Sequence, residues 1–265
     1  SASTGSGNAV TGSRTVNPDS DIRRAYHGLG NKVGPFSRAL VRYTVPLPLS
    51  GHVETDTFFS SRVDIDAMRH FCLLGHRVPT TPDFSLDALP SEAGRLDIFC
   101  RAISAAFVLS HDIREDVRVS LVLQDEFTIQ FDGADLRNLN PDERSTAALV
   151  RTALEHREDA IGHMPAESSP GVSISRKDFE TTLSEAATDS TVVHLHEDGD
   201  PIVDVEPPED PLFVLSDHES FTDAESDLLE EYADRRVSLS PRALHADHAI
   251  TVTHNYLDTG GFQRY

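Results

Sequence analysis

Lysine, cysteine and long apolar runs are scarce in this chain. Only two of its 265 residues are lysine, Lys32 and Lys177, so nearly all of the positive charge is carried by arginine. No stretch of about eighteen consecutive apolar residues occurs, which argues against a membrane-spanning helix. The first residues also lack the basic start and apolar centre of a secretory signal. These absences predict a cytoplasmic protein that does not enter a membrane.

The two cysteines, Cys72 and Cys100, lie in apolar stretches without the CxxC or Cys/His spacing of a metal site. We therefore expect two buried thiols. Histidine pairs occur at 194 and 196 and at 245 and 248, but no cysteine accompanies them, and we expect no bound metal. The GxSxG, GxGxxG and P-loop motifs are absent, which argues against a serine hydrolase of that type, a Rossmann dinucleotide site and a P-loop nucleotide site.

The charge balance is strongly acidic. The chain carries 23 basic and 44 acidic side chains, a net charge of -21. Such self-repulsion destabilises a compact fold at low salt, and together with the scarcity of lysine it predicts a halophilic host. Charge alone favours an acidic cytosolic enzyme without a polyanionic partner. At about 1 M salt, however, the Debye length is only about 3 Å, so a local arginine cluster can still bind phosphates.

Residues 1–67 differ from the rest of the chain. They hold 7 basic and 6 acidic side chains, whereas residues 68–265 hold 16 and 38. The first segment shows no sustained helical or strand period, but apolar patterning begins directly after Met68. We expect 1–67 to be a disordered extension, or one translated from upstream of the true start, and 68–265 to be the globular domain. An accessory arm whose arginines contact RNA is the competing interpretation.

Strands and helices alternate in the predicted domain. Expected strands span 70–75, 117–123 and 127–131. Expected helices span 91–111, 140 to about 153, 223 to about 233 and 245–257. The first helix is indicated by Leu96, Phe99, Ile103 and Phe107, whose spacing places them on one face. The alternation predicts an α/β fold with a mainly parallel sheet.

Residues of the N-cap type mark the starts of two of these helices. Asn140 followed by Pro141 and two acids predicts an N-cap with proline at the first helical position. Thr222 followed three residues later by Glu225 has the form of a capping box. A helix is therefore expected to start at each of these two motifs.

Three segments of the C-terminal half each combine an apolar run with a polar end: HLHEDG (194–199), FVLSDH (213–218) and VSLSPRALHADHAI (237–250). Each is expected to be a strand that runs into a loop. Because ligands of α/β proteins bind where the carboxyl ends of parallel strands meet, the three loops are expected to form one pocket.

These segments also carry a family resemblance. LGHRVPTTPDFSLDALPSEAGRLDIFCR, LNPDERSTAALVRTALEH, HLHEDG, FVLSDH and LHADHAITVTHNYLD, within 68–265, resemble the archaeal TrmY family. The resemblance implies a SPOUT-type fold with a C-terminal trefoil knot, an exception to the rule that chains are not knotted. It implies that the protein uses S-adenosylmethionine to methylate N1 of pseudouridine 54 in the T-loop of tRNA. A homodimer is implied too, since SPOUT proteins complete the RNA site across two subunits.

The resemblance further implies the cofactor-binding residues. Leu195 and Ser216 are expected to line the adenosine pocket, and Ala249 to close it. The segment between them wraps the adenine with backbone groups and consists of Leu239, Ser240, Pro241, Arg242, Ala243 and Leu244. Many relatives have glycine at the place of Ser216 and cysteine at the place of Ala249. We expect the pocket to tolerate both changes, but any role of that cysteine is lost.

Methyl transfer to pseudouridine N1 requires that the N–H proton be removed, so a carboxylate or histidine is expected nearby. Asp97 is the candidate base, with Arg95 beside it as a catalytic partner. Arg101, four residues on, and Arg114 are candidate RNA contacts because arginine binds phosphate bidentately. The Asp97–Arg101 spacing is equally compatible with a solvated helical ion pair of little consequence.

Two alternatives to this function stay open. A methyltransferase for a pseudouridine of ribosomal RNA is the nearest competitor within the enzyme class. A knotted RNA-binding relative without catalytic activity is the other, and the departures at Ser216 and Ala249 are the features that favour it.

Overall fold

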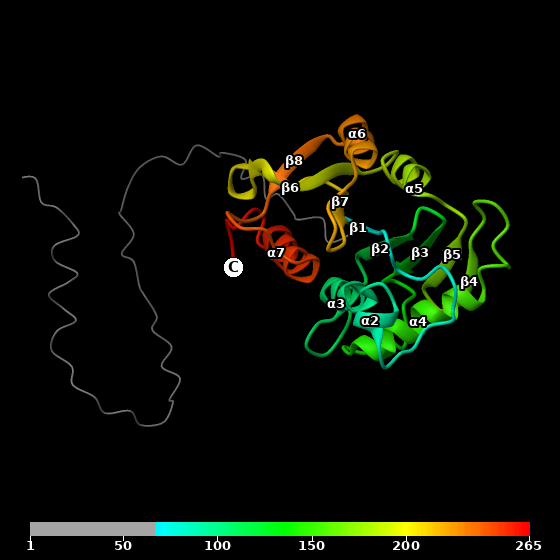
Figure 1. Cartoon of the computed structure of the whole chain (residues 1–265). Coiled ribbons are helices and arrows are strands. Elements are labelled where there is room, and N and C mark those ends of the chain that lie inside the picture. The colour runs from blue at the N-terminus through cyan, green and yellow to red at the C-terminus, as the bar shows by residue number, and fades with distance from the viewer. Residues whose placement is uncertain (1–66) are drawn as a thin grey trace, which may run out of the picture. The chain divides into compact units, whose positions relative to one another are not determined.

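The computed structural model describes residues 67–265 (Figure 1). Residues 1–66, and with them the expectation for the N-terminal extension, lie outside this range. Within the described range no helix is both long and apolar enough to cross a bilayer.

Eight strands form one sheet in the order β4-β5-β3-β2-β1-β7-β6-β8. The strands are β1 (Arg69–Gly75), β2 (Val117–Leu123), β3 (Phe127–Asp132), β4 (Ala166–Ser169), β5 (Val172–Ser175), β6 (Thr191–Pro201), β7 (Pro211–Ser216) and β8 (Arg235–Ser238). β2, β1, β7, β6 and β8 run parallel, whereas β3, β5 and β4 extend the sheet in antiparallel fashion. The prediction of an α/β fold with a mainly parallel sheet is confirmed. The strand order does not test the trefoil knot, which stays a prediction.

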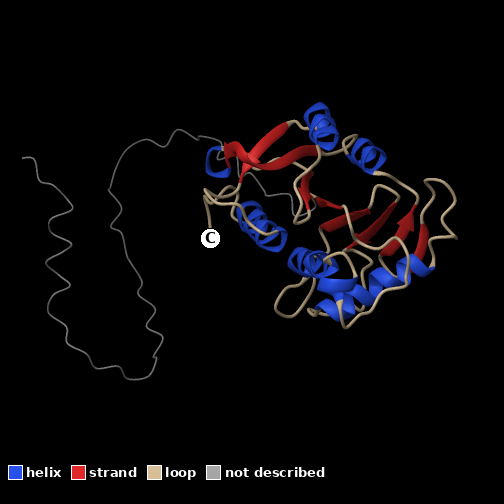
Figure 2. Ribbon diagram, in the orientation of Figure 1, coloured by secondary structure: helices blue, strands red, loops and turns tan. Residues whose placement is uncertain are grey.

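Helices cover both faces of this sheet (Figures 1 and 2). They are α2 (Leu89–Glu92), α3 (Leu96–Phe107), α4 (Glu143–Glu155), α5 (Phe179–Ala186), α6 (Asp223–Tyr232) and α7 (Ala246–Asp258), with a short 3-10 turn at Ile202–Asp204. Helices α3, α4 and α7 pack on one face, and α5 and α6 on the other. Because successive strand residues point to opposite faces, Phe71 and Leu73 of β1 join the first core while Cys72 and Leu74 join the second.

Both cysteines are buried free thiols, as predicted. They lie in different cores, Cys72 with α5 and α6 and Cys100 with α3. Burial raises the pKa of the Cys72 thiol to about 12, so it stays protonated and unreactive.

Three helix boundaries differ from the sequence prediction, one of them because α3 ends at Phe107 rather than at residue 111. The expected helix over 91–111 is divided into α2 and α3, because Gly94 and Arg95 adopt left-handed φ values of 54° and 64°. Helix α4 begins at Glu143 rather than next to Asn140, because the Asp142 carboxylate accepts the Ser145 N–H at 2.8 Å and caps the helix there. The capping box of α6 is confirmed, with both of its hydrogen bonds present.

Strand β6 continues past the point where the sequence predicts that it ends. Its register against β8 shifts, so that Leu195 and Asp200 both pair with Val237. At Gly199 the two backbones approach closely, and an added Cβ would lie 2.6 Å from the Val237 nitrogen. Because β6, β7 and β8 are parallel, the carboxyl ends of β7 and β8 face the same edge of the sheet, whereas β6 continues to Pro201.

Candidate functional site

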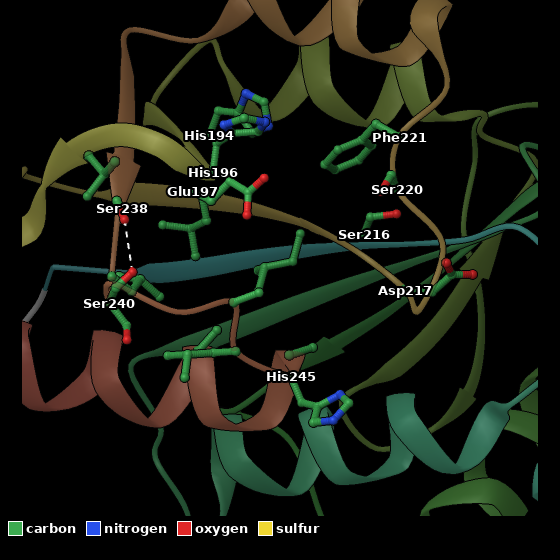
Figure 3. A pocket seen from close by; sticks show the side chains of 18 of the residues that line it. His194, His196, Glu197, Ser216, Asp217, Ser220, Phe221, Ser238, Ser240 and His245 are labelled. Atoms are coloured by element: carbon green, nitrogen blue, oxygen red, sulfur yellow. Dashed lines mark hydrogen bonds between the residues drawn. The ribbon is translucent and has the colours of Figure 1, made fainter.

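A cavity of about 560 Å³ lies where the middle of β6, from His194 to Glu197, and the carboxyl ends of β7 and β8 meet the first turn of α7 (Figure 3). The three polar-ended segments of the sequence all contribute to it. Eight of the nine residues predicted to bind the cofactor line this cavity: Leu195, Ser216, Leu239, Ser240, Arg242, Ala243, Leu244 and Ala249. Pro241 is exposed and is the one that does not line it. The structure therefore brings these eight residues together around one cavity. Their role in cofactor binding stays a prediction.

The wall of the cavity against the core is apolar. Ile98 of α3, Leu215 of β7 and Ala249 of α7 are buried and line it, with Leu195 and Leu239 packed against the same core. The Ser216 hydroxyl donates to the Glu219 carbonyl oxygen at 2.6 Å. This serine thus stabilises the turn after β7, a contact that a glycine at this position cannot make.

The turn after β7 is also held by a buried carboxylate. Asp217 has no exposed side-chain surface and accepts the backbone N–H groups of Glu219 at 2.6 Å and of His76 at 2.9 Å. The His76 ring lies between two acids, with Nδ1 3.1 Å from Asp217 and Nε2 3.1 Å from Glu225. Burial lowers the pKa of His76, but its hydrogen bonds to Glu225 and Asp217 and their charges outweigh burial and raise this pKa above its ordinary value.

This arrangement makes the stabilisation from His76 dependent on pH. Because the folded-state pKa is raised, the stabilisation is complete below the unfolded value of about 6.5 and is lost as pH rises through the folded pKa. His76→Gln cannot carry the charge. We expect the melting temperature of the variant, measured in high salt, to lie furthest below that of the wild type at about pH 6 and to approach it as pH rises. A difference that stays constant with pH contradicts this account.

Residues at the α6 end of the cavity were not among the predicted cofactor residues. His194, His196, Phe221, Glu230 and Arg236 all line the cavity. The ring centroids of His194 and His196 are 5.3 Å apart, which agrees with the alternation of strand residues. Within residues 67–265 no group of three or more His, Cys, Asp or Glu side chains is placed to hold a metal ion. The sequence signal at this end of the cavity is the His-x-His pair, a pattern that indicates metal binding rather than a cofactor pocket.

Asp97 does not line the cavity, although its neighbour Ile98 does. Its carboxylate is buried and accepts two hydrogen bonds from Arg95, at 3.0 and 3.1 Å, and one from Arg101 at 3.1 Å. Burial alone would raise the pKa of Asp97, but these two guanidinium groups outweigh it and hold the pKa below its ordinary value. The carboxylate is therefore ionised at neutral pH, and both of its oxygens are engaged.

The two predicted RNA-contact arginines are both in ion pairs. Arg101 contacts Glu143 at 3.1 Å as well as Asp97. Arg114 donates two hydrogen bonds to Asp258 at the end of α7, at 2.6 and 3.2 Å. Neither lines the cavity beside β6, β7 and β8, and binding to a phosphate would have to compete with these carboxylates. Their roles in RNA binding stay predictions.

A mainly parallel sheet with a cavity at the carboxyl ends of adjacent strands is the arrangement of an α/β protein that binds a small molecule. The chain belongs to the family described as "Putative SAM-dependent RNA methyltransferase", whose model matches residues 68–262.

Named relatives match the same part of the chain. It is 70% identical over 198 residues to a protein of Haloferax volcanii named tRNA (pseudouridine(54)-N(1))-methyltransferase, a match that covers 75% of this chain and 100% of the relative. A Haloarcula marismortui protein with the same name is 66% identical over 198 residues, which again cover 75% of this chain and 100% of the relative. Among solved structures, Archaeoglobus fulgidus Nep1 bound to S-adenosylhomocysteine is 13% identical with a TM-score of 0.49, over 72% of this chain and 97% of that one.

Proposed function

We propose that this protein transfers a methyl group from S-adenosylmethionine to N1 of pseudouridine 54 in the T-loop of tRNA. The observation that carries the proposal is the 70% identity to a relative of that name over its full length. The cavity supports it, since the segments that form the cavity are those in which the family resemblance lies.

The residues present fit S-adenosylmethionine. The cavity is of the size that encloses a cofactor, and it combines apolar walls with polar groups that have no protein partner: both ring nitrogens of buried His194 are unpaired. Leu195, Ser216, Ala249 and the 239–244 segment would hold the adenosine part. When bound, S-adenosylmethionine supplies an electrophilic methyl group. The contribution of the chain is to hold the donor and the acceptor nitrogen in line.

Proton removal from the acceptor is assigned to Asp97, with Arg95 beside it. Support for this assignment comes from the ionised state of Asp97, which leaves its carboxylate able to accept a proton. The same geometry supports a second role, in which Asp97 orients Arg95 and Arg101 toward the RNA. Arg101 and Arg114 are assigned to phosphate contacts. To bind a phosphate, each arginine has to leave its carboxylate partners.

A homodimer in the cytoplasm is part of the proposal. Support for a second subunit comes from the family resemblance. Sedimentation of the full chain in molar KCl should give twice the mass of the chain, and a monomer contradicts this part of the proposal.

The test is methylation of defined RNAs. A tRNA carrying pseudouridine 54 should be methylated at N1 in molar KCl, whereas the same tRNA with uridine 54 should not. A ribosomal RNA fragment containing pseudouridine is the competing substrate, and preference for it favours the alternative enzyme. Binding of tRNA without any methylation favours a non-catalytic RNA-binding protein. A chain that begins at Met68 should match the full chain, since we propose that 68–265 carry the activity alone.

A further inference from the structure

The α6 end of the cavity presents an unusual polar group. His194 of β6 is 3% exposed, and neither of its ring nitrogens has a hydrogen-bond partner. Its ring packs edge-on against His196 and Phe221, with centroid distances of 5.3 and 5.6 Å. A buried polar atom without a partner costs free energy of folding, and such atoms are few in native proteins. Since His194 lines the cavity, a bound molecule can supply the missing partner.

His194 is uncharged at neutral pH. Burial lowers its pKa to about 4, helped by the charge of His196 and then of Arg236, against a smaller opposing effect of Glu230. A neutral imidazole has one donor and one acceptor nitrogen. It can therefore donate a hydrogen bond to an anionic group or accept one from a cationic group, and it repels neither charge.

A pair of opposite charges lies at the same end of the cavity. Arg236 of β8 and Glu230 of α6 both line it and form an ion pair, with 2.7 Å between guanidinium and carboxylate. Their side chains remain 40% and 62% exposed, so each can take a further partner. Figure 3 shows His194 and His196 near the α6 side of the cavity and His245 on the opposite side, near α7.

We propose that His194, Glu230 and Arg236 bind the α-amino and α-carboxylate groups of the methionine part of S-adenosylmethionine. Arg236 contacts the carboxylate bidentately, Glu230 contacts the ammonium group, and His194 completes its hydrogen bonding on one of them. The inference rests on the proposed function, because it names the part of the methyl donor that this end recognises. The adenosine part then occupies the opposite end, formed by the 239–244 segment.

Other occupants fit these residues less well. A metal ion requires a third ligand, and the described residues offer no such group. A nucleobase matches the rings of Phe221 and His196, but it gives no reason for an arginine and a glutamate side by side. The amino-acid part of S-adenosylmethionine carries one positive and one negative group, so it can contact Glu230, Arg236 and the neutral imidazole of His194 together.

The test compares two ligands that differ in the amino-acid part alone. S-adenosylhomocysteine carries it, and 5′-methylthioadenosine lacks it. Binding to the full chain is measured by calorimetry in molar KCl. Arg236→Gln should weaken the affinity for S-adenosylhomocysteine about 10-fold, the equivalent of one charge-assisted contact. It should weaken the affinity for 5′-methylthioadenosine less than about twofold. The matched control is Arg235→Gln. Arg235 precedes Arg236 on the same strand, binds the Glu206 carbonyl oxygen and does not line the cavity, so both affinities should be unchanged.

His194→Phe provides a second variant that separates binding from folding. It keeps the ring and removes the two unpaired nitrogens, so the ligand-free melting temperature should stay equal or rise while S-adenosylhomocysteine binding weakens about 10-fold. A general folding defect would lower both. The proposal is overturned if the variants lose equal affinity for the two ligands, or if they lose affinity for neither. If the wild type binds neither ligand, this inference and the assigned cofactor both fail, whereas loss of tRNA methylation alone leaves the amino-acid site standing.

Discussion

Replacing Asp97 by asparagine should slow turnover by about 100-fold or more, the usual contribution of a general base. The asparagine amide cannot accept a proton, and its nitrogen would face the guanidinium groups of Arg95 and Arg101. The affinity for S-adenosylmethionine should be unchanged, because Asp97 does not line the cavity. Single-turnover methylation and calorimetry in the same buffer measure the two quantities. Unchanged turnover rejects any role of this carboxylate in the reaction.

The pH profile then decides between the two roles of Asp97. If Asp97 is the base, the residual rate of the variant should rise with pH as solvent replaces it, whereas the wild type should stay level above the lowered pKa of Asp97. If Asp97 only orients Arg95 and Arg101, both profiles should keep the same shape and the KM for tRNA should rise. The melting temperature of the variant must also be measured, because removing the Asp97 carboxylate leaves Arg95 and Arg101 without their buried acidic partner and can destabilise the fold.

Substituting Gly199 by valine should both destabilise the fold and weaken cofactor binding. A Cβ at Gly199 would lie 2.6 to 2.7 Å from backbone atoms of Val237, so β6 and β8 must separate. Overpacking of this kind costs about 1–3 kcal/mol of unfolding free energy. Because β8 leads directly into the 239–244 segment, we also expect S-adenosylmethionine affinity to fall by about 10-fold or more, equivalent to about 1.4 kcal/mol.

Gly162→Asn serves as the control for this substitution. Gly162 has a positive φ of 58° and nothing within 4 Å of an added Cβ, and asparagine tolerates that conformation. Urea unfolding in high salt should leave this variant within about 0.5 kcal/mol of the wild type. If Gly199→Val is equally mild, the close approach of β6 and β8 does not stabilise the cavity.

Local patterns in the sequence determined several features of the structure. The capping box at Thr222 and Glu225 acts within one helical turn, and the alternation in VRVSLVL marks β2 residue for residue. The three polar-ended segments predicted a single pocket, and all three line one cavity, although HLHEDG lies within β6 rather than in a loop after it.

The structure changed other predictions because contacts between distant parts of the chain decide them. The helix over 91–111 is broken by the left-handed Gly94, where a Cβ would meet the Arg77 carbonyl oxygen, a contact that periodicity does not reveal. The antiparallel edge of β3, β5 and β4 likewise depends on pairing with β2 and was not predicted. The sequence also did not reveal that the end of α7 brings Asp258 to Arg114, the predicted phosphate contact.

The sequence by itself therefore determined the fold class, the buried thiols and the segments that form the cavity, because these follow from periodicity and from residues close in the chain. The tertiary structure decided which charges are engaged and which polar atoms are left for a ligand. Arg114 is paired with Asp258, which lies 144 residues further along the chain, and His194 is buried with both nitrogens unpaired. Such differences arise from burial and from partners distant in sequence, which no local pattern encodes.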